Sequence, residues 1–130
     1  KKLKNILIYP RNIFTLIDEL KRNSIDKIFI LYPDPWPKKK HFKRRLISKI
    51  FLKRLHKILK KSGMILISTD SLSYLYAIFY EFSLNPNFEW ANKDAADCYK
   101  RPLEIIKSKY ERKADIERND KYFLKFKKIC

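Results

Sequence analysis

Residues 27–38 read KIFILYPDPWPK, and this stretch decides the fold that we expect. The run 27–32 is apolar, rich in isoleucine and stopped by Pro33, which is typical of a buried strand. Because prolines occupy three of the next five positions, the backbone there is stiff and can join neither a helix nor a sheet. The sequence therefore predicts that Asp34 is held on a rigid loop directly after a strand. The alternative is a proline-rich turn with a solvated carboxylate.

Strand-like and helix-like segments alternate on both sides of this stretch. Short apolar runs predict buried strands at 6–9, 27–32 and 64–68, and apolar residues at helical spacing predict helices at 13–20, 41–61 and 71–82. Ser62 and Gly63 are expected to end the long helix. The last third predicts an edge strand within 85–90, a loop with a short helix within 100–114, and a terminal strand at 122–127. This order predicts one α/β domain over residues 1–130, with a mostly parallel sheet and helices on both faces.

Polar residues follow three of the predicted strands. In an α/β protein, ligands bind beyond the carboxyl ends of the parallel strands, which meet at one edge of the sheet. Asn12, Asp34 and Asp70 each lie just past a predicted strand. We expect these three side chains to converge on the same edge and to form a pocket.

The charge of the chain predicts a polyanionic partner. The sequence has 31 Lys and Arg against 14 Asp and Glu, a formal net charge of +17. Such a domain repels itself unless it meets RNA, DNA or an anionic membrane. No apolar run approaches the roughly 20 residues that span a bilayer, and no signal-peptide pattern is present, so we expect a cytoplasmic protein without a membrane partner.

A cluster of cations lies directly after the proline-rich loop. It comprises Lys38, Lys39, Lys40, Lys43, Arg44 and Arg45. Such a run is commonly a solvated helix face, but beside a carboxylate in an expected pocket it predicts a clamp for the backbone phosphates of a nucleic acid. Trp36, His41 and Phe42 add rings on which a base can stack.

The cysteines do not indicate a metal site. Cys98 and Cys130 have no CxxC spacing and no neighbouring histidine. We therefore expect reduced thiols, with neither a disulfide nor zinc.

The motifs around Asp34 resemble the signature of the bacterial tRNA (guanine-N7-)-methyltransferase family. The matching residues are PDPWPKK at 33–39, His41 and KRRL at 43–46. Further matching blocks are STD at 68–70, KSKYE at 107–111, KA at 113–114 and YFLKF at 122–126. The resemblance extends over nearly the whole chain. It implies a Rossmann-like fold and transfer of a methyl group from S-adenosylmethionine to the variable-loop guanosine of tRNA, with no role for DNA.

The resemblance also implies roles for individual residues. Asp34 is the catalytic acid and borders the cofactor, which Asn12 also touches. The guanosine is held by Lys38, Asp70, Ser108, Lys109, Tyr110 and Glu111. Ser108 stands where the family usually has threonine, and the hydroxyl is retained. The other cations of the cluster are expected to hold the RNA backbone.

The implied reaction suits these residue types. N7 of guanine carries a free lone pair, so attack on the sulfonium methyl group requires no prior deprotonation. Positioning is therefore expected to dominate the rate enhancement. Carboxylates accept hydrogen bonds from the guanine N1–H and N2–H groups and stabilise the cationic product.

The sequence departs from the family in its glycine content. Gly63 is the single glycine, so the glycine-rich turn and early strands that hold S-adenosylmethionine in this family are missing from these residues. We expect either part of a longer enzyme, or a split or decayed gene product that binds tRNA without methylating it. A weaker alternative is a basic scaffold of ribonucleoprotein without a pocket. Homodimerisation, or completion by a separate amino-terminal piece, stays open because part of the expected sheet is missing.

Overall fold

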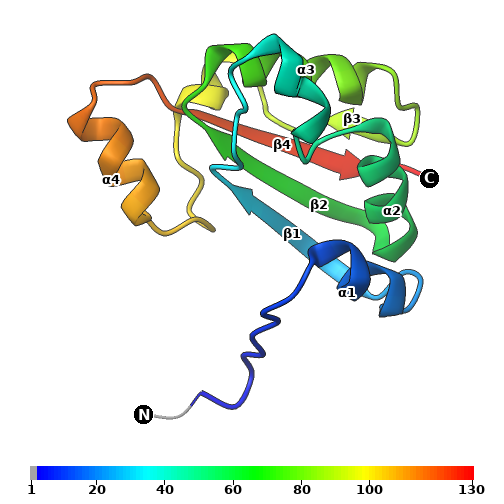
Figure 1. Cartoon of the computed structure of the whole chain (residues 1–130). Helices are drawn as coiled ribbons and strands as arrows, with labels where there is room; N and C mark the ends of the chain where they lie inside the picture. The colour runs from blue at the N-terminus through cyan, green and yellow to red at the C-terminus, as the bar shows by residue number, and fades with distance from the viewer. Residues whose placement is uncertain (1–2) are drawn as a thin grey trace.

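The protein is built on a mixed four-stranded sheet. The computed structural model describes residues 3–130, and its strands are β1 (Ile25–Leu31), β2 (Leu59–Thr69), β3 (Phe88–Trp90) and β4 (Tyr122–Lys128). Their order is β1-β2-β4-β3, with β1 and β2 parallel and the other two pairs antiparallel (Figure 1). The α/β class expected from the sequence is confirmed, but the described sheet is mixed where a mostly parallel one was expected.

Helices connect the strands and cover one face of the sheet. They are α1 (Ile13–Glu19), the 3-10 helix η1 (Lys39–Arg44), α2 (Lys49–Ile58), α3 (Leu72–Ser83), the 3-10 helix η2 (Ala95–Tyr99) and α4 (Lys109–Ile116). Serine side chains cap the amino ends of α2, α3 and α4, because each hydroxyl accepts a hydrogen bond from a backbone N–H of the first turn. In Figure 1, α4 lies apart from the other helices, beyond the carboxyl ends of β1 and β2.

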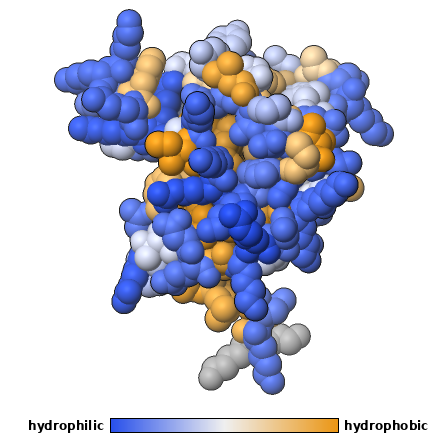
Figure 2. Space-filling model, turned by 90° about the vertical axis from the view of Figure 1, so that its right-hand side faces the viewer, coloured by the Kyte–Doolittle hydropathy of each residue, from blue (hydrophilic) through white to orange (hydrophobic). Residues whose placement is uncertain are grey.

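The main core lies between the sheet and the helices α1, α2 and α3. Ile65 and Ile67 of β2 face these helices, and alternate residues of β4 extend the same apolar layer. A smaller cluster of Leu66, Phe123 and Ile105 lies apart from this core. Since side chains alternate along a strand, this second cluster lies on the opposite face of the sheet. Figure 2 shows mostly hydrophilic side chains on the face viewed from the right-hand side of Figure 1, with hydrophobic patches between them.

Truncation of Ile67 is expected to destabilise the fold strongly. The side chain is fully buried in the main core, so Ile67→Ala should lower the free energy of unfolding by about 2–5 kcal/mol through lost burial and a cavity. Ile50→Ala, on the exposed face of α2, is the matched control because that side chain is 65% exposed. Urea unfolding monitored by circular dichroism measures both; equal losses for the two variants would contradict the assigned core.

The strand predicted at 6–9 does not form. Leu7 and Ile8 are 98% and 88% exposed, and this segment projects from the body of the protein in Figure 1. A strand needs a neighbour to receive its backbone hydrogen bonds. Apolar composition therefore predicted the local tendency of the segment without supplying that neighbour.

The long helix predicted at 41–61 is divided into η1 and α2. Ser48 caps a new helix, with its hydroxyl accepting from the backbone N–H of Phe51 at 3.2 Å, and the chain enters β2 at Leu59. Ser62 and Gly63 therefore lie within the strand and do not end the helix. Gly63 is required for a close approach, since a Cβ atom there would lie 2.7 Å from the carbonyl oxygen of Lys60.

Candidate active site

The loop that carries Asp34 is rigid, as the sequence predicted. The Asp34 carboxylate is exposed, and its Oδ1 accepts a hydrogen bond from the backbone N–H of Trp36 at 3.1 Å. Tyr32 and Trp36, on either side of the acid, have φ angles of 52° and 41°. Such left-handed conformations of bulky residues are strained and persist only where surrounding contacts hold them. The surrounding structure therefore imposes the conformation of this loop.

Asp34 and Asp70 lie at the same edge of the sheet. Leu31 of β1 pairs with Ser68 of the parallel strand β2, and the backbone N–H of Tyr32 donates to the Ser68 carbonyl oxygen at 2.8 Å. Asp34 and Asp70 thus each follow the carboxyl end of one of two adjacent parallel strands. The Asp70 Oδ2 atom accepts a hydrogen bond from the Asn119 side chain at 3.1 Å, which connects this acid to the segment after α4.

The segment 108–111 begins α4 and contributes one buried acid. The Ser108 hydroxyl caps the helix by accepting from the backbone N–H of Glu111 at 3.2 Å. Glu111 is buried and forms an ion pair with Arg101 at 3.5 Å. Lys109 and Tyr110 are exposed, with the ammonium of Lys109 5.1 Å from the centre of the Tyr110 ring. The four residues therefore divide into a cap, a buried acid and an exposed basic and aromatic surface.

Tyr32 is a residue of this edge that the sequence reasoning did not single out. Burial raises the pKa of its phenol strongly, and the negative charges of Glu111 and Asp70 raise it further, against the opposing charge of Arg101. These charges act on one phenol, which indicates that Asp70 and Glu111 lie near each other. Within residues 3–130 the buried Tyr32 hydroxyl has no hydrogen-bond partner. No sequence pattern distinguishes this tyrosine from an apolar strand residue.

Buried tyrosines are expected to make the protein sensitive to alkaline pH. The pKa values of Tyr32, Tyr74 and Tyr122 are raised above their ordinary value, mainly by burial. Above pH about 10 the unfolded chain releases phenolic protons that the folded state keeps, so the free energy of unfolding falls as pH rises. The lowered pKa of Lys128 acts in the opposite sense, but three tyrosines are expected to outweigh it.

Thermal unfolding followed between pH 8 and pH 11 measures this effect. Tyr122→Phe should make the fall in melting temperature less steep, because it removes one of the three phenols. Tyr80→Phe is the matched control, since Tyr80 is 62% exposed. The same alkaline slope for the wild type and Tyr122→Phe would contradict the assignment.

The basic cluster is exposed with one exception. Lys38, Lys39, Lys40, Lys43 and Arg44 are on the surface in and beside η1, and the Arg44 guanidinium lies 5.1 Å from the centre of the Trp36 ring. Arg45, which was predicted to hold the RNA backbone, is only 8% exposed. Its Nε donates to the Pro35 carbonyl oxygen at 2.7 Å. That prediction is wrong, because tertiary contacts bury the guanidinium away from the surface a phosphate would approach.

Asn12 does not join the two acids through any described contact. Its side chain caps α1, with Oδ1 accepting from the backbone N–H of Phe14 at 2.9 Å. In Figure 1, α1 is separated from the loop that follows β1. The expected convergence of Asn12 with Asp34 and Asp70 is therefore not observed, and its contact with a cofactor stays a prediction.

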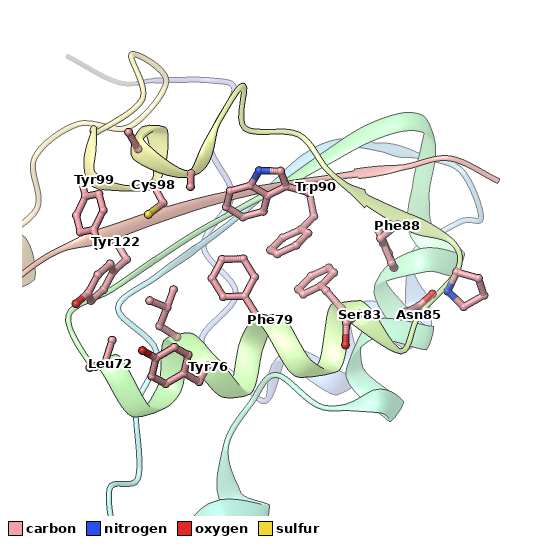
Figure 3. A pocket seen from close by; sticks show the side chains of 16 residues that line it. Leu72, Tyr76, Phe79, Ser83, Asn85, Phe88, Trp90, Cys98, Tyr99 and Tyr122 are labelled. Carbon is pink, nitrogen blue, oxygen red and sulfur yellow. The ribbon is translucent and has the colours of Figure 1, made fainter.

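The largest cavity lies elsewhere, between α3, η2 and the strands β3 and β4. This aromatic groove has a volume of about 850 Å³ and is lined mainly by apolar rings, among them Tyr76, Phe79, Trp90, Tyr99 and Tyr122 (Figure 3). None of the predicted site residues lines it. The acids therefore lie on an open edge of the sheet and not in this groove.

Two further searches bear on the class of protein. No group of three or more histidine, cysteine or acidic side chains in residues 3–130 is arranged to hold a metal ion. Within the same residues, no helix has the length and apolar character needed to cross a membrane.

Known proteins resemble this chain in sequence and in fold. A family model described as "Putative methyltransferase" matches residues 1–124. The tRNA (guanine-N(7)-)-methyltransferase of Rhizobium etli is 39% identical over 127 residues, which cover 97% of this chain and 55% of that protein. The enzyme of the same name from Agrobacterium fabrum is 36% identical over 126 residues, covering 97% of this chain and 54% of the relative. The chain thus spans about half the length of the curated relatives it matches.

A solved structure supports the fold assignment. The SAM-dependent methyltransferase from Archaeoglobus fulgidus superposes with a TM-score of 0.52 at 11% identity, covering 95% of this chain and 68% of that one. At this identity the likeness shows the fold alone, a Rossmann-like α/β arrangement. Together with the match over residues 1–124, it shows that the chain belongs to this methyltransferase family.

Proposed function

We propose that this chain is the guanosine-binding and acid-bearing part of a tRNA (guanine-N7-)-methyltransferase. The observation that carries the proposal is the placement of Asp34 and Asp70 after adjacent parallel strands, with Glu111 of α4 near Asp70. Ligands of α/β sheets bind at this edge. The relatives that share these motifs bear the name of this activity.

The acids suit the Watson–Crick edge of guanine. Asp70 and Glu111 accept hydrogen bonds from the N1–H and N2–H groups of the base, which adenine cannot donate in the same pattern. Asp34, exposed on its rigid loop, stabilises the positive charge that develops on the base as N7 becomes methylated. Lys38, Ser108, Lys109 and Tyr110 complete the proposed contacts with the nucleotide. S-adenosylmethionine supplies an activated methyl group as a sulfonium ion.

The described residues fit only part of the binding site for S-adenosylmethionine. The exposed carboxylate of Asp34 is placed at the edge where such a ligand would lie. Gly63, however, is packed inside β2 and cannot form a turn around the methionine moiety. We therefore assign to these residues the orientation of the base and leave the grip on the methyl donor to other groups.

The basic cluster supports RNA as the partner. Five exposed cations follow the acid loop directly, so they can hold phosphates beside the base that enters the site. The target guanine must leave its stack to reach the acids, and the exposed ring of Tyr110 offers a surface for stacking. Cytoplasmic location, and completion of the sheet at the edge strand β1 by a second copy or a separate piece, are predictions of the same proposal.

Transfer of radiolabelled methyl groups tests the proposal. Unmodified tRNA and labelled S-adenosylmethionine are incubated with the full-length gene product, and the position of the label is determined by nuclease digestion and chromatography. Label on N7 of the variable-loop guanosine is the expected result. No label with tRNA still bound would instead support an RNA-binding remnant, and neither label nor binding would support neither reading.

A further inference from the structure

Arg45 differs from the other cations of the basic cluster in its surroundings. Its guanidinium is buried, yet it forms no ion pair with any carboxylate of residues 3–130. A buried, unpaired charge is costly and is uncommon unless other groups satisfy it. The cost suggests that the position of this guanidinium matters for more than stability.

The contacts of Arg45 join the two loops that carry the candidate acids. Nε donates to the carbonyl oxygen of Pro35, the residue after Asp34, at 2.7 Å. Nη2 donates to the Ser73 hydroxyl at 2.7 Å, three residues after Asp70 in the first turn of α3. A guanidinium is planar and rigid, so two such bonds fix both the separation and the relative orientation of their partners.

Aromatic rings hold the guanidinium in this position. Its central carbon lies 4.0 Å from the centre of the Phe42 ring and 5.0 Å from that of Tyr74. The Tyr74 hydroxyl in turn accepts a hydrogen bond from the backbone N–H of Ile47 at 3.1 Å. The side chain is therefore fixed by packing between η1 and α3 and cannot turn outward without disrupting these contacts.

We propose that Arg45 is a positioning residue that sets the geometry of Asp34 relative to Asp70, and that it is not a phosphate ligand. The inference rests on the proposed function. The loop between Tyr32 and Trp36 is strained on both sides of Asp34, and the bond to Pro35 holds it in that conformation. Because misplacement by about 1 Å can cost roughly 100-fold in rate, loss of this bond acts on the chemical step through Asp34.

Arg45→Lys tests the inference, because it keeps the charge but loses the planar pair of donors. Single-turnover methyl transfer at saturating tRNA is expected to fall by roughly 10- to 100-fold, with the dissociation constant for tRNA and its salt dependence unchanged. Arg44→Gln should show the opposite pattern, weaker binding with a shallower salt dependence. Arg54→Lys, at an exposed ion pair with Asp18, is the control that should leave both properties unchanged. A salt dependence that falls equally in Arg45→Lys and Arg44→Gln would overturn the inference.

A second measurement does not depend on activity. The Trp36 amide is protected by its hydrogen bond to Asp34, so hydrogen exchange at this amide should accelerate in Arg45→Lys and in Ser73→Ala. Ser73→Ala removes a single bond from the other side and keeps the test available if Arg45→Lys does not fold. In the double variant the two effects should add to less than their sum, and full additivity would contradict the shared bridge. If the wild type transfers no methyl group, the proposed function fails while this measurement still tests the bridge.

Discussion

Asp34→Asn is expected to lower the rate of methyl transfer by roughly 100- to 1,000-fold with little change in affinity for tRNA. The substitution keeps the size of the side chain and the oxygen that accepts from the Trp36 amide, so the loop should retain its conformation. It removes the negative charge that faces the developing cation on the base. The loss therefore falls on the transition state and not on ground-state binding. Single-turnover kinetics with labelled S-adenosylmethionine, together with tRNA binding by filter retention, separates the two.

Asp26→Asn is the matched control for this experiment. Asp26 lies near the amino end of the same strand β1, where it forms an exposed ion pair with Lys60. Exposed pairs contribute little to stability, so the variant should transfer methyl groups at the wild-type rate. If Asp34→Asn lost its activity because tRNA binding collapsed, the proposed role of Asp34 in the chemical step would be wrong.

Removal of three exposed cations is expected to have the second largest effect. In Lys39→Ala/Lys43→Ala/Arg44→Ala, three side chains that can hold phosphates beside the acid loop are lost. Affinity for tRNA should fall by roughly 100-fold at moderate salt, since each lost contact releases fewer counterions. The slope of the logarithm of the association constant against the logarithm of salt concentration should become shallower by about 2–3. Titrations at several salt concentrations measure both quantities.

A control with the same change in net charge separates local contacts from overall attraction. Lys27→Ala/Lys57→Ala/Lys61→Ala also removes three exposed cations, but near the amino ends of β1 and β2. This triple variant should lose much less affinity, because only the long-range field is weakened. Equal losses in the two triple variants would contradict a local phosphate clamp beside Asp34 and would favour diffuse binding over the whole basic surface.

Local patterns in the sequence predicted the elements that hold the site. The strand before Asp34, the rigid loop around it and the strand before Asp70 are all observed where they were expected. Each depends on interactions between near neighbours, such as an apolar run, the fixed φ of proline, or a serine cap. The helix before β2 was predicted too long, since its apolar spacing continues across the point where Ser48 starts a new helix.

Long-range contacts decided the features that periodicity could not reveal. Arg44 and Arg45 are identical in type and adjacent in sequence, yet one is exposed and the other is buried against Pro35 and Ser73. Glu111 is buried beside Arg101 while Lys109, two residues earlier, is exposed. These differences depend on which distant segments pack against each side chain, and no spacing rule within one segment contains that information.

The sequence by itself determined the α/β class, the resemblance to a methyltransferase family and the two acids after parallel strands. Short-range sterics and side-chain alternation are sufficient for these, because they act within a few residues along the chain. Only the tertiary structure decided that β4 returns antiparallel, that the segment 6–9 lacks a strand partner, and that Arg45 joins the loops of Asp34 and Asp70. Each of these requires residues far apart in sequence to meet, and such meetings are selected by burial and hydrogen bonding across the whole domain.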